Sequence, residues 1–235
     1  MKHIKTLAII PARGGSKGLP GKNYKPLLGK PLFIYSVEVA KSTNNISNVI
    51  VSTDCEKVIE ISRKNNVDVC IRPSYLATDT SLVIDAVRYT VTKEEKKKGY
   101  RFDYIILLEP TSPMRTIEIV SDCTNILIND NNIKSIATYS ETELPPTRAW
   151  SIRGGKAQPY IKDANPWLPR QQHENGYQLN GLYYGICRDR LINDNCPSLV
   201  TDEHFAYITP RDISIDIDTE IDFNIVEYLI DKDKG

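Results

Sequence analysis

Short apolar runs recur along the chain at intervals that fit a sheet of buried strands. The first, Leu7 to Pro11, is continuously apolar and stops at a glycine-rich turn. A run without alternation is typical of a strand that is covered on both faces in a parallel sheet. Further strands are predicted at residues 48–52, 67–71, 104–108 and 135–139, and the regular pattern returns at 181–186 and 205–208.

Helical patterns lie between these runs. The predicted helices cover residues 33–40, 56–65, 81–93, 117–128 and 221–230. Strands that alternate with helices in this way build parallel sheets, because each helix carries the chain back to the start of the next strand. The sequence therefore predicts an α/β fold with a mostly parallel open sheet flanked by helices.

The segment from residue 141 to 176 breaks this rhythm. It contains five prolines, two adjacent glycines at 154 and 155, and no long apolar period. We interpret it as an arm inserted into one domain. A chain of 235 residues lies within the size range of single α/β domains, so the predicted domain spans residues 1–235.

Charge and cysteine content exclude several functions. The 30 basic and 30 acidic side chains leave no net formal charge, so nucleic acid is not expected as a partner. The N-terminal apolar run Leu7 to Ile10 is too short for a signal peptide and far below the ~20 residues of a membrane span. We therefore expect a cytoplasmic protein that does not bind membranes. The five cysteines never form a CxxC spacing, which suggests neither a disulfide framework nor a zinc site.

The densest chemical signal is the loop PARGGSKGLPGKN at residues 11–23, directly after the first predicted strand. In open α/β sheets, ligands bind beyond the carboxyl ends of the strands. The glycines let backbone amides approach an anion, and Arg13, Lys17 and Lys22 add three cations. We interpret the loop as a polyphosphate site, with an ordinary basic surface loop as the alternative.

Two widespread phosphate-binding motifs do not fit this loop. A Walker A loop requires glycine in place of Ser16 and serine or threonine in place of Asn23. The dinucleotide-binding fingerprint requires glycine in place of Arg13. The loop therefore indicates neither an ATPase nor a dehydrogenase.

A second signal is the pair Asp216 and Asp218 in the segment SIDIDT, residues 214–219. On a predicted strand, residues two apart share a face, so both carboxylates would point the same way and could bind Mg²⁺. A triphosphate ligand would need such a cation to offset its charge. A solvated strand edge without a metal is the alternative.

The phosphate loop is the first of seven blocks that run from near residue 7 to near residue 222. The others are STD at 52–54, RPSYLATDTS at 72–81, EPTSPMRT at 109–116, PRQQ at 169–172, NG at 180–181 and SIDIDTEID at 214–222. In this order they resemble the CMP-sialic acid synthetases over almost the whole chain. The resemblance implies a Rossmann-like nucleotidyltransferase fold. It also implies an enzyme that transfers CMP from CTP to the anomeric hydroxyl of a nonulosonic (sialic-acid-like) sugar and releases pyrophosphate.

The resemblance assigns roles by position. The residues that match the family's CTP-phosphate loop are Arg13, Ser16, Lys17 and Lys22, and those that match the cytidine surroundings are Asn23, Arg72 and Ser81. The sugar-side positions are Arg170, Asn180 and Tyr184, and the metal-associated positions are Asp216 and Asp218, with Mg²⁺ as the implied cofactor. The arm matches the excursion that contacts a second subunit in the family, so a homodimer is expected. Its Trp150 and Trp167 are candidates for that contact or for stacking on the sugar.

The implied reaction is an in-line displacement at the α-phosphorus of CTP. Arg13, Lys17 and Lys22 would stabilise the departing pyrophosphate, and positioning and charge neutralisation would supply most of the catalysis. Arg170 would hold the sugar carboxylate. The base that deprotonates the hydroxyl stays open between Asp216 and a metal-bound hydroxide.

One position departs from the family pattern. The block at residue 109 begins with Glu109, where the family usually has glutamine. If it faces the sugar, a carboxylate replaces an amide that both donates and accepts, and the preferred sugar would change. A structural cap or salt bridge is the alternative. The rival functions are a related cytidylyltransferase acting on KDO or another sugar, and a non-catalytic nucleotide-binding relative.

Overall fold

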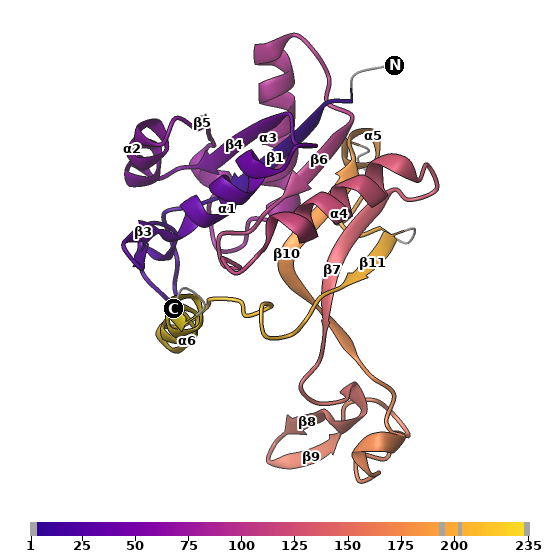
Figure 1. Cartoon of the computed structure of the whole chain (residues 1–235). Helices are drawn as coiled ribbons and strands as arrows, with labels where there is room; N and C mark the ends of the chain where they lie inside the picture. The colour runs from indigo at the N-terminus through magenta and orange to yellow at the C-terminus, as the bar shows by residue number, and fades with distance from the viewer. Residues whose placement is uncertain (1–3, 193–195, 202–203, 233–235) are drawn as a thin grey trace.

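A seven-stranded sheet forms the centre of the protein (Figure 1). The computed structural model describes residues 4–192, 196–201 and 204–232. The strand order is β11-β7-β10-β6-β1-β4-β5. The strands are β1 (Thr6–Pro11), β4 (Asn48–Thr53), β5 (Asp68–Ile71), β6 (Tyr104–Leu107), β7 (Ser135–Glu141), β10 (Tyr177–Cys187) and β11 (His204–Ile208). Strand β10 runs antiparallel to β6 and β7 and the other pairs are parallel, so the predicted fold class is confirmed.

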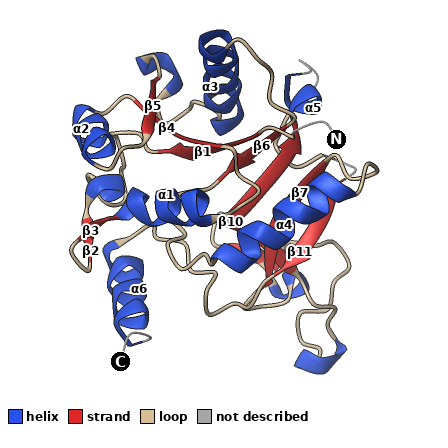
Figure 2. Ribbon diagram, turned by 45° about the horizontal axis from the view of Figure 1, so that its top comes forward, coloured by secondary structure: helices blue, strands red, loops and turns tan. Residues whose placement is uncertain are grey.

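The central strand β1 is buried on both faces, as its unbroken apolar run predicts. Ala8 and Ile10 pack into one core cluster with Phe33 of α1 (Leu32–Ser42). Leu7 and Ile9 pack into the opposite cluster, which contains side chains from α3 (Val83–Lys98). The remaining helices are α2 (Glu56–Lys64), α4 (Ile117–Asn129), α5 (Arg188–Ile192) and α6 (Glu220–Lys232). Helices α1 and α4 cover one face and α3 and α5 the other, which gives three layers (Figure 2).

Most predicted helices agree with the structure to within about two residues. Helix α3 differs, since it begins at Val83 and continues to Lys98, five residues beyond the prediction. It ends at Gly99, which adopts a positive φ of 72° and caps the helix. No helix in the described part of the chain is long and apolar enough to cross a membrane.

The prediction of a strand at residues 214–219 is wrong. The segment lies outside the sheet and crosses the loop that follows β6, where the Ile217 amide donates to the Thr111 carbonyl at 2.9 Å. Ile217 is fully buried in a third core cluster with Leu19 and with Phe223 of α6. The alternation of isoleucine and aspartate therefore reports an extended segment with one buried face, and not a member of a sheet.

The segment between β7 and β10 projects away from the sheet (Figure 1). It carries a hairpin in which β8 (Trp150–Arg153) pairs antiparallel with β9 (Lys156–Pro159). Gly154 and Gly155 make the turn with φ of 55° and 76°, which side chains rarely adopt. Several large apolar side chains of this arm are exposed: Leu144, Trp150, Ile152, Tyr160 and Trp167.

Candidate active site

The loop after β1 lies at the carboxyl ends of the parallel strands and is folded back on itself. The Asn23 side-chain amide donates to the Arg13 carbonyl at 2.8 Å, and the Gly14 amide donates to Asp54 at 3.0 Å. A Cβ on Gly18 would come within 2.5 Å of the Asp218 carbonyl oxygen. Glycine is therefore required there so that the loop can approach the segment before α6.

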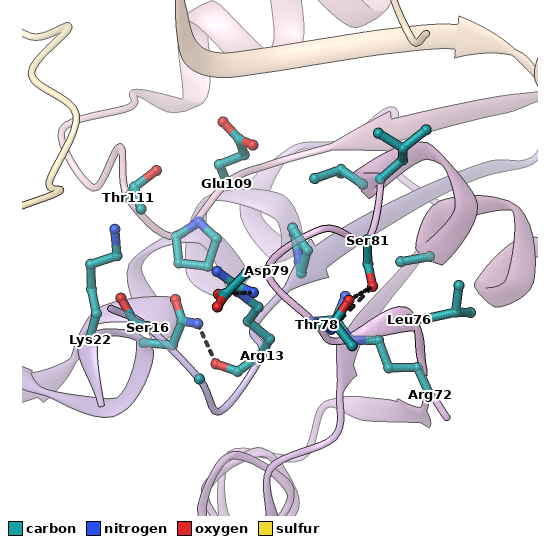
Figure 3. Close-up of a pocket in the computed structure, with 17 residues that line it drawn as sticks. Arg13, Ser16, Lys22, Arg72, Leu76, Thr78, Asp79, Ser81, Glu109 and Thr111 are labelled. Atoms are coloured by element: carbon teal, nitrogen blue, oxygen red, sulfur yellow. Dashed lines mark hydrogen bonds and ion pairs between the residues drawn. The ribbon is translucent and has the colours of Figure 1, made fainter. Parts of the chain in front are cut away.

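A cavity of about 330 Å³ opens beside this loop. Figure 3 shows Lys22, Ser16 and Thr111 on one side of it, and Ser81, Thr78 and Arg72 on the other. It brings together seven of the predicted site residues: Arg13, Ser16, Lys22, Asn23, Arg72, Ser81 and Glu109. These residues come from the loops after β1, β5 and β6, which the parallel sheet places at one edge.

Asp79 lies among the phosphate-loop cations and was not identified from the sequence. Its two carboxylate oxygens pair with Arg13 at 3.0 Å and with Lys17 at 2.8 Å. These contacts hold the pKa of Asp79 below its usual value, with the Lys17 hydrogen bond as the largest cause. Lys17 itself is 81% exposed and does not line the cavity. The Asp79 carboxylate thus forms ion pairs with two of the cations that a polyphosphate would contact.

Lys22 connects the phosphate loop to the segment before α6. Its ammonium donates to the Ile217 carbonyl at 2.6 Å and pairs with Asp218 at 3.0 Å. The Lys22 side chain is only 10% exposed, while that of Asp218 is 74% exposed. The cation is therefore fixed at the cavity wall with one partner that can turn away into solvent.

Arg72 is buried beneath the cavity. Its Nε has no hydrogen-bond partner among the described residues. Burial lowers the pKa of Arg72, and the nearby Asp54 carboxylate partly opposes this effect. A buried guanidinium nitrogen without a partner is costly, so a ligand acceptor in this cavity would stabilise it.

The acidic segment before α6 gathers carboxylates at the edge of the site. Burial raises the pKa of Asp216, although its side chain still reaches solvent, and the Asp218 charge adds to the rise. Asp222 is occupied differently, because it accepts hydrogen bonds from the amides of Asp218 and Thr219 and so caps α6. Among the described residues, no three His, Cys, Asp or Glu side chains group as metal ligands. A cation at Asp216 and Asp218 would therefore need further oxygen ligands from a bound substrate.

Glu109 follows β6 and lines two cavities. Burial raises the pKa of its carboxyl from 4.5 to about 7, and the Asp216 charge acts in the same direction. The Glu109 carboxylate packs against Gly181, where a Cβ would lie 2.8 Å from its oxygen. The hydrogen bonds of Glu109 with Ser36 and Arg115 go to its backbone carbonyl, and its carboxylate oxygens are not among the buried polar atoms that lack a partner. The structural cap and the salt bridge considered from the sequence are therefore both absent from its described surroundings.

The loop that carries Glu109 is held in place by Arg115, which sequence analysis did not single out. The Arg115 guanidinium donates to the Ser36 hydroxyl at 2.7 Å, to the Glu109 and Gly181 carbonyls at 2.9 Å each, and to the Leu182 carbonyl. Burial lowers the pKa of Arg115 to about 10. The sequence shows Arg115 in the segment PTSPMR, but it does not show that the partners of Arg115 are carbonyls of β10.

The predicted sugar-side residues do not share one location. Tyr184 lines a second cavity, next to Glu109, and burial raises its pKa. Asn180 is buried, and its amide group bonds to Thr209, Ser214 and the Leu182 amide. Arg170 lies on the arm and lines a separate cavity with Tyr177 and Arg211. Roles of Asn180 and Arg170 at the sugar stay predictions.

A sequence model of the cytidylyltransferase family matches residues 7–144, more than half of the chain. The chain belongs to this family. The CMP-N,N'-diacetyllegionaminic acid synthase of Legionella pneumophila is 33% identical over 233 residues, which cover 97% of each chain. The pseudaminic acid cytidylyltransferase of Campylobacter jejuni is 28% identical over 229 residues, 96% of each chain.

A solved structure agrees with this assignment at the level of the fold. A CMP:2-keto-3-deoxy-manno-octonic acid synthetase complexed with CTP superposes with a TM-score of 0.74, covering 97% of this chain and 99% of that one. At 17% identity this likeness supports the cytidylyltransferase fold alone. The predicted resemblance to the nonulosonate cytidylyltransferases is confirmed by the family match and by the names of the full-length relatives.

Proposed function

We propose that this cytidylyltransferase transfers CMP from CTP to the anomeric hydroxyl of a nonulosonic acid and releases pyrophosphate. The observation that carries the proposal is the cavity in which Arg13, Lys22 and Arg72 converge at the carboxyl end of the sheet. Full-length relatives named for legionaminic and pseudaminic acids support the class of sugar.

The reaction balances as a single displacement. The anomeric oxygen forms a bond to the α-phosphorus, the bond from that phosphorus to the pyrophosphate oxygen breaks, and the hydroxyl proton leaves to a base. Arg13, Lys17 and Lys22 stabilise the negative charge on the departing pyrophosphate. Asp79 must release Arg13 and Lys17 when the phosphates bind, since both now pair with its carboxylate. Asp216, whose pKa is raised by burial, is the candidate base.

Mg²⁺ is part of this proposal. Asp216 and Asp218 supply carboxylate oxygens of the kind that a hard cation prefers, and their mutual repulsion contributes to the raised pKa of Asp216. A cation would relieve that repulsion. When bound, it would offset phosphate charge.

We also propose that the protein acts as a homodimer through its arm. Trp150, Pro166 and Trp167 line an exposed hollow with Leu144 and Arg148, and Trp167 is 82% exposed. Apolar surface of this kind on a segment without its own core is typical of a subunit interface.

All five cysteines are free, which supports the reducing cytoplasm as the site of the reaction.

The decisive test is pyrophosphate release by the purified chain with CTP, Mg²⁺ and a panel of sugars. We expect turnover with at least one nonulosonic acid and little with KDO, and no comparable turnover when ATP, GTP or UTP replaces CTP. Turnover with KDO alone would favour the related KDO-loading enzyme. CTP binding without turnover for any sugar in the panel would favour the non-catalytic relative.

A control variant links this activity to the phosphate loop. Lys22→Ala should lower kcat about a hundredfold or more, because it removes a cation that acts on developing charge. Lys25→Ala removes a neighbouring lysine whose ammonium pairs with Glu220 instead, and it should leave kcat nearly unchanged. Wild-type kinetics in folded Lys22→Ala would remove Lys22 from the site.

A further inference from the structure

The Asp79 carboxylate bridges two cations of the phosphate loop. One of its oxygens lies 3.0 Å from the Arg13 guanidinium, and the other lies 2.8 Å from the Lys17 ammonium. Figure 3 shows Asp79 beside Arg13 in the cavity of about 330 Å³, which both residues line. A carboxylate with one oxygen on each cation makes the same kind of charge-assisted contact that a phosphate group would make there.

Asp79 reaches these cations from the opposite wall of the cavity. It lies in an exposed turn between β5 and α3, which hydrogen bonds between Thr78 and Ser81 close. The Asp79 side chain is 42% exposed, so it can rotate away from Arg13 and Lys17 into solvent while the turn keeps these hydrogen bonds. The carboxylate can therefore leave the two cations and return to them without a change of the backbone.

The shape of the phosphate loop does not depend on Asp79. The Asn23 side-chain amide donates to the Arg13 carbonyl at 2.8 Å, and the Gly14 amide donates to Asp54 at 3.0 Å. These contacts fix the backbone of the loop, whereas the ion pairs of Asp79 involve only the ends of two side chains. An uncharged side chain at position 79 would therefore leave the loop in place and free its cations.

We propose that Asp79 is an internal competitor of the departing pyrophosphate, which takes Arg13 and Lys17 back one at a time and so speeds the release of this product. The inference rests on the proposed function, in which these cations stabilise that pyrophosphate. No covalent bond changes in this step, because ion pairs to phosphate oxygens are exchanged for ion pairs to a carboxylate. Asp79 is tethered beside the cations at an effective concentration on the order of millimolar, so it competes with an anion of higher charge.

This competition separates the ligands of the cavity into two groups. Pyrophosphate and CTP carry the phosphates that would bind Arg13 and Lys17, so both must displace Asp79. CMP lacks those phosphates and leaves the ion pairs intact. Because exposed ion pairs are weak, removal of the Asp79 charge should tighten pyrophosphate binding by up to about fivefold, chiefly through slower dissociation, and leave CMP binding unchanged.

The test compares the wild type and Asp79→Asn as complete chains. Isothermal titration calorimetry with Mg²⁺ measures the Kd of pyrophosphate and the Kd of CMP without turnover. Stopped-flow detection of pyrophosphate, with CTP, Mg²⁺ and a nonulosonic acid, measures the rate of product release. We expect the Kd of pyrophosphate and the release rate to fall by similar factors in Asp79→Asn, while the Kd of CMP stays the same.

Several results would overturn the inference. These are a pyrophosphate Kd that is unchanged or raised, an equal change of Kd for pyrophosphate and CMP, and release at the wild-type rate despite tighter binding. Each of them, found in a protein that turns over, leaves the proposed function intact. No turnover by the wild type with any nonulosonic acid would overturn the proposed function, and with it the role of Asp79 in product release.

Three further variants show whether the effect comes from the charge of Asp79. Asp79→Glu keeps the carboxylate and should hold the Kd of pyrophosphate within about twofold of the wild type. Asp85→Asn is the matched control, because the Asp85 side chain is 48% exposed and pairs with Arg88 on α3, outside the cavity. It should change neither Kd. In Lys17→Met, which lacks one of the two pairs, adding Asp79→Asn should tighten pyrophosphate binding only about twofold, and a full fivefold gain would contradict an exchange at Lys17.

Discussion

Glu109→Gln should make the protein more stable at alkaline pH, with almost no effect in acid. The pKa of Glu109 is raised from 4.5 to about 7, chiefly by burial. Below pH 4.5 the carboxyl is protonated in both the folded and the unfolded chain. As the pH rises from 4.5 to 7, the unfolded chain ionises first, so the free energy of unfolding falls. Above pH 7 this loss is complete, and it amounts to about 3 kcal/mol.

The amide of Glu109→Gln does not ionise, so the variant avoids that loss. At pH 8.5 we expect it to unfold at a temperature at most roughly 10 °C above that of the wild type, since about 1 kcal/mol shifts the melting temperature of a chain of this size by 2–4 °C. The figure is an upper bound, because part of the Glu109 side chain still reaches solvent. At pH 5 the difference should stay below about 1 kcal/mol.

Thermal melts of the two proteins at pH 5 and pH 8.5 measure this effect directly. Glu174→Gln is the control, because Glu174 is an exposed glutamate on the arm, outside both cavities. It should shift the melting temperature by little at either pH. A Glu109→Gln shift that is equal at the two pH values would refute the reasoning, since only ionisation of Glu109 makes the shift depend on pH.

Three further predictions concern the nucleotide, the metal and the arm. Asp79→Asn should lower KM for CTP by up to about fivefold in steady-state kinetics, because its exposed ion pairs no longer compete with the phosphates for Arg13 and Lys17. An increased KM would contradict this. Asp216→Asn and Asp218→Asn should sharply lower the rate of pyrophosphate release. In a Mg²⁺ titration, at least one of them should raise the Mg²⁺ concentration that gives the half-maximal rate. Unchanged metal dependence in both folded variants would exclude the metal role. Light scattering should report twice the 26.6 kDa chain mass for the wild type and a larger monomer fraction for Trp167→Glu. A wild-type protein that is active as a monomer would refute the proposed dimer.

The sequence predicted those parts of the structure that depend on local pattern. Strand β1 was predicted because a strand buried on both faces has an unbroken run of apolar residues. The loop after it was predicted because backbone amides that approach an anion require several glycines close together in the sequence. The strand predicted at residues 214–219 is wrong because that prediction also used only the local pattern. Alternation reports which side is buried, and Ile217 is buried beneath α6 rather than within a sheet.

The parts of the site that escaped prediction depend on distant partners. Asp79 pairs with Arg13 across 66 positions of sequence, and neither residue alone indicates the other. Arg115 holds backbone carbonyls on β10, and carbonyls carry no sequence signal at all. The second cavity is assembled from four separate segments, so its aliphatic character is visible only once the chain is folded.

The contact between Lys22 and Ile217 joins positions 195 apart in the chain. During synthesis, the phosphate loop leaves the ribosome early, but Lys22 can reach the Ile217 carbonyl only after the 195 positions that separate them have been translated. A chain that stopped short of Ile217 would keep every glycine of the loop but would lack this acceptor for the Lys22 ammonium, so the segment before α6 completes the placement of a phosphate-loop cation.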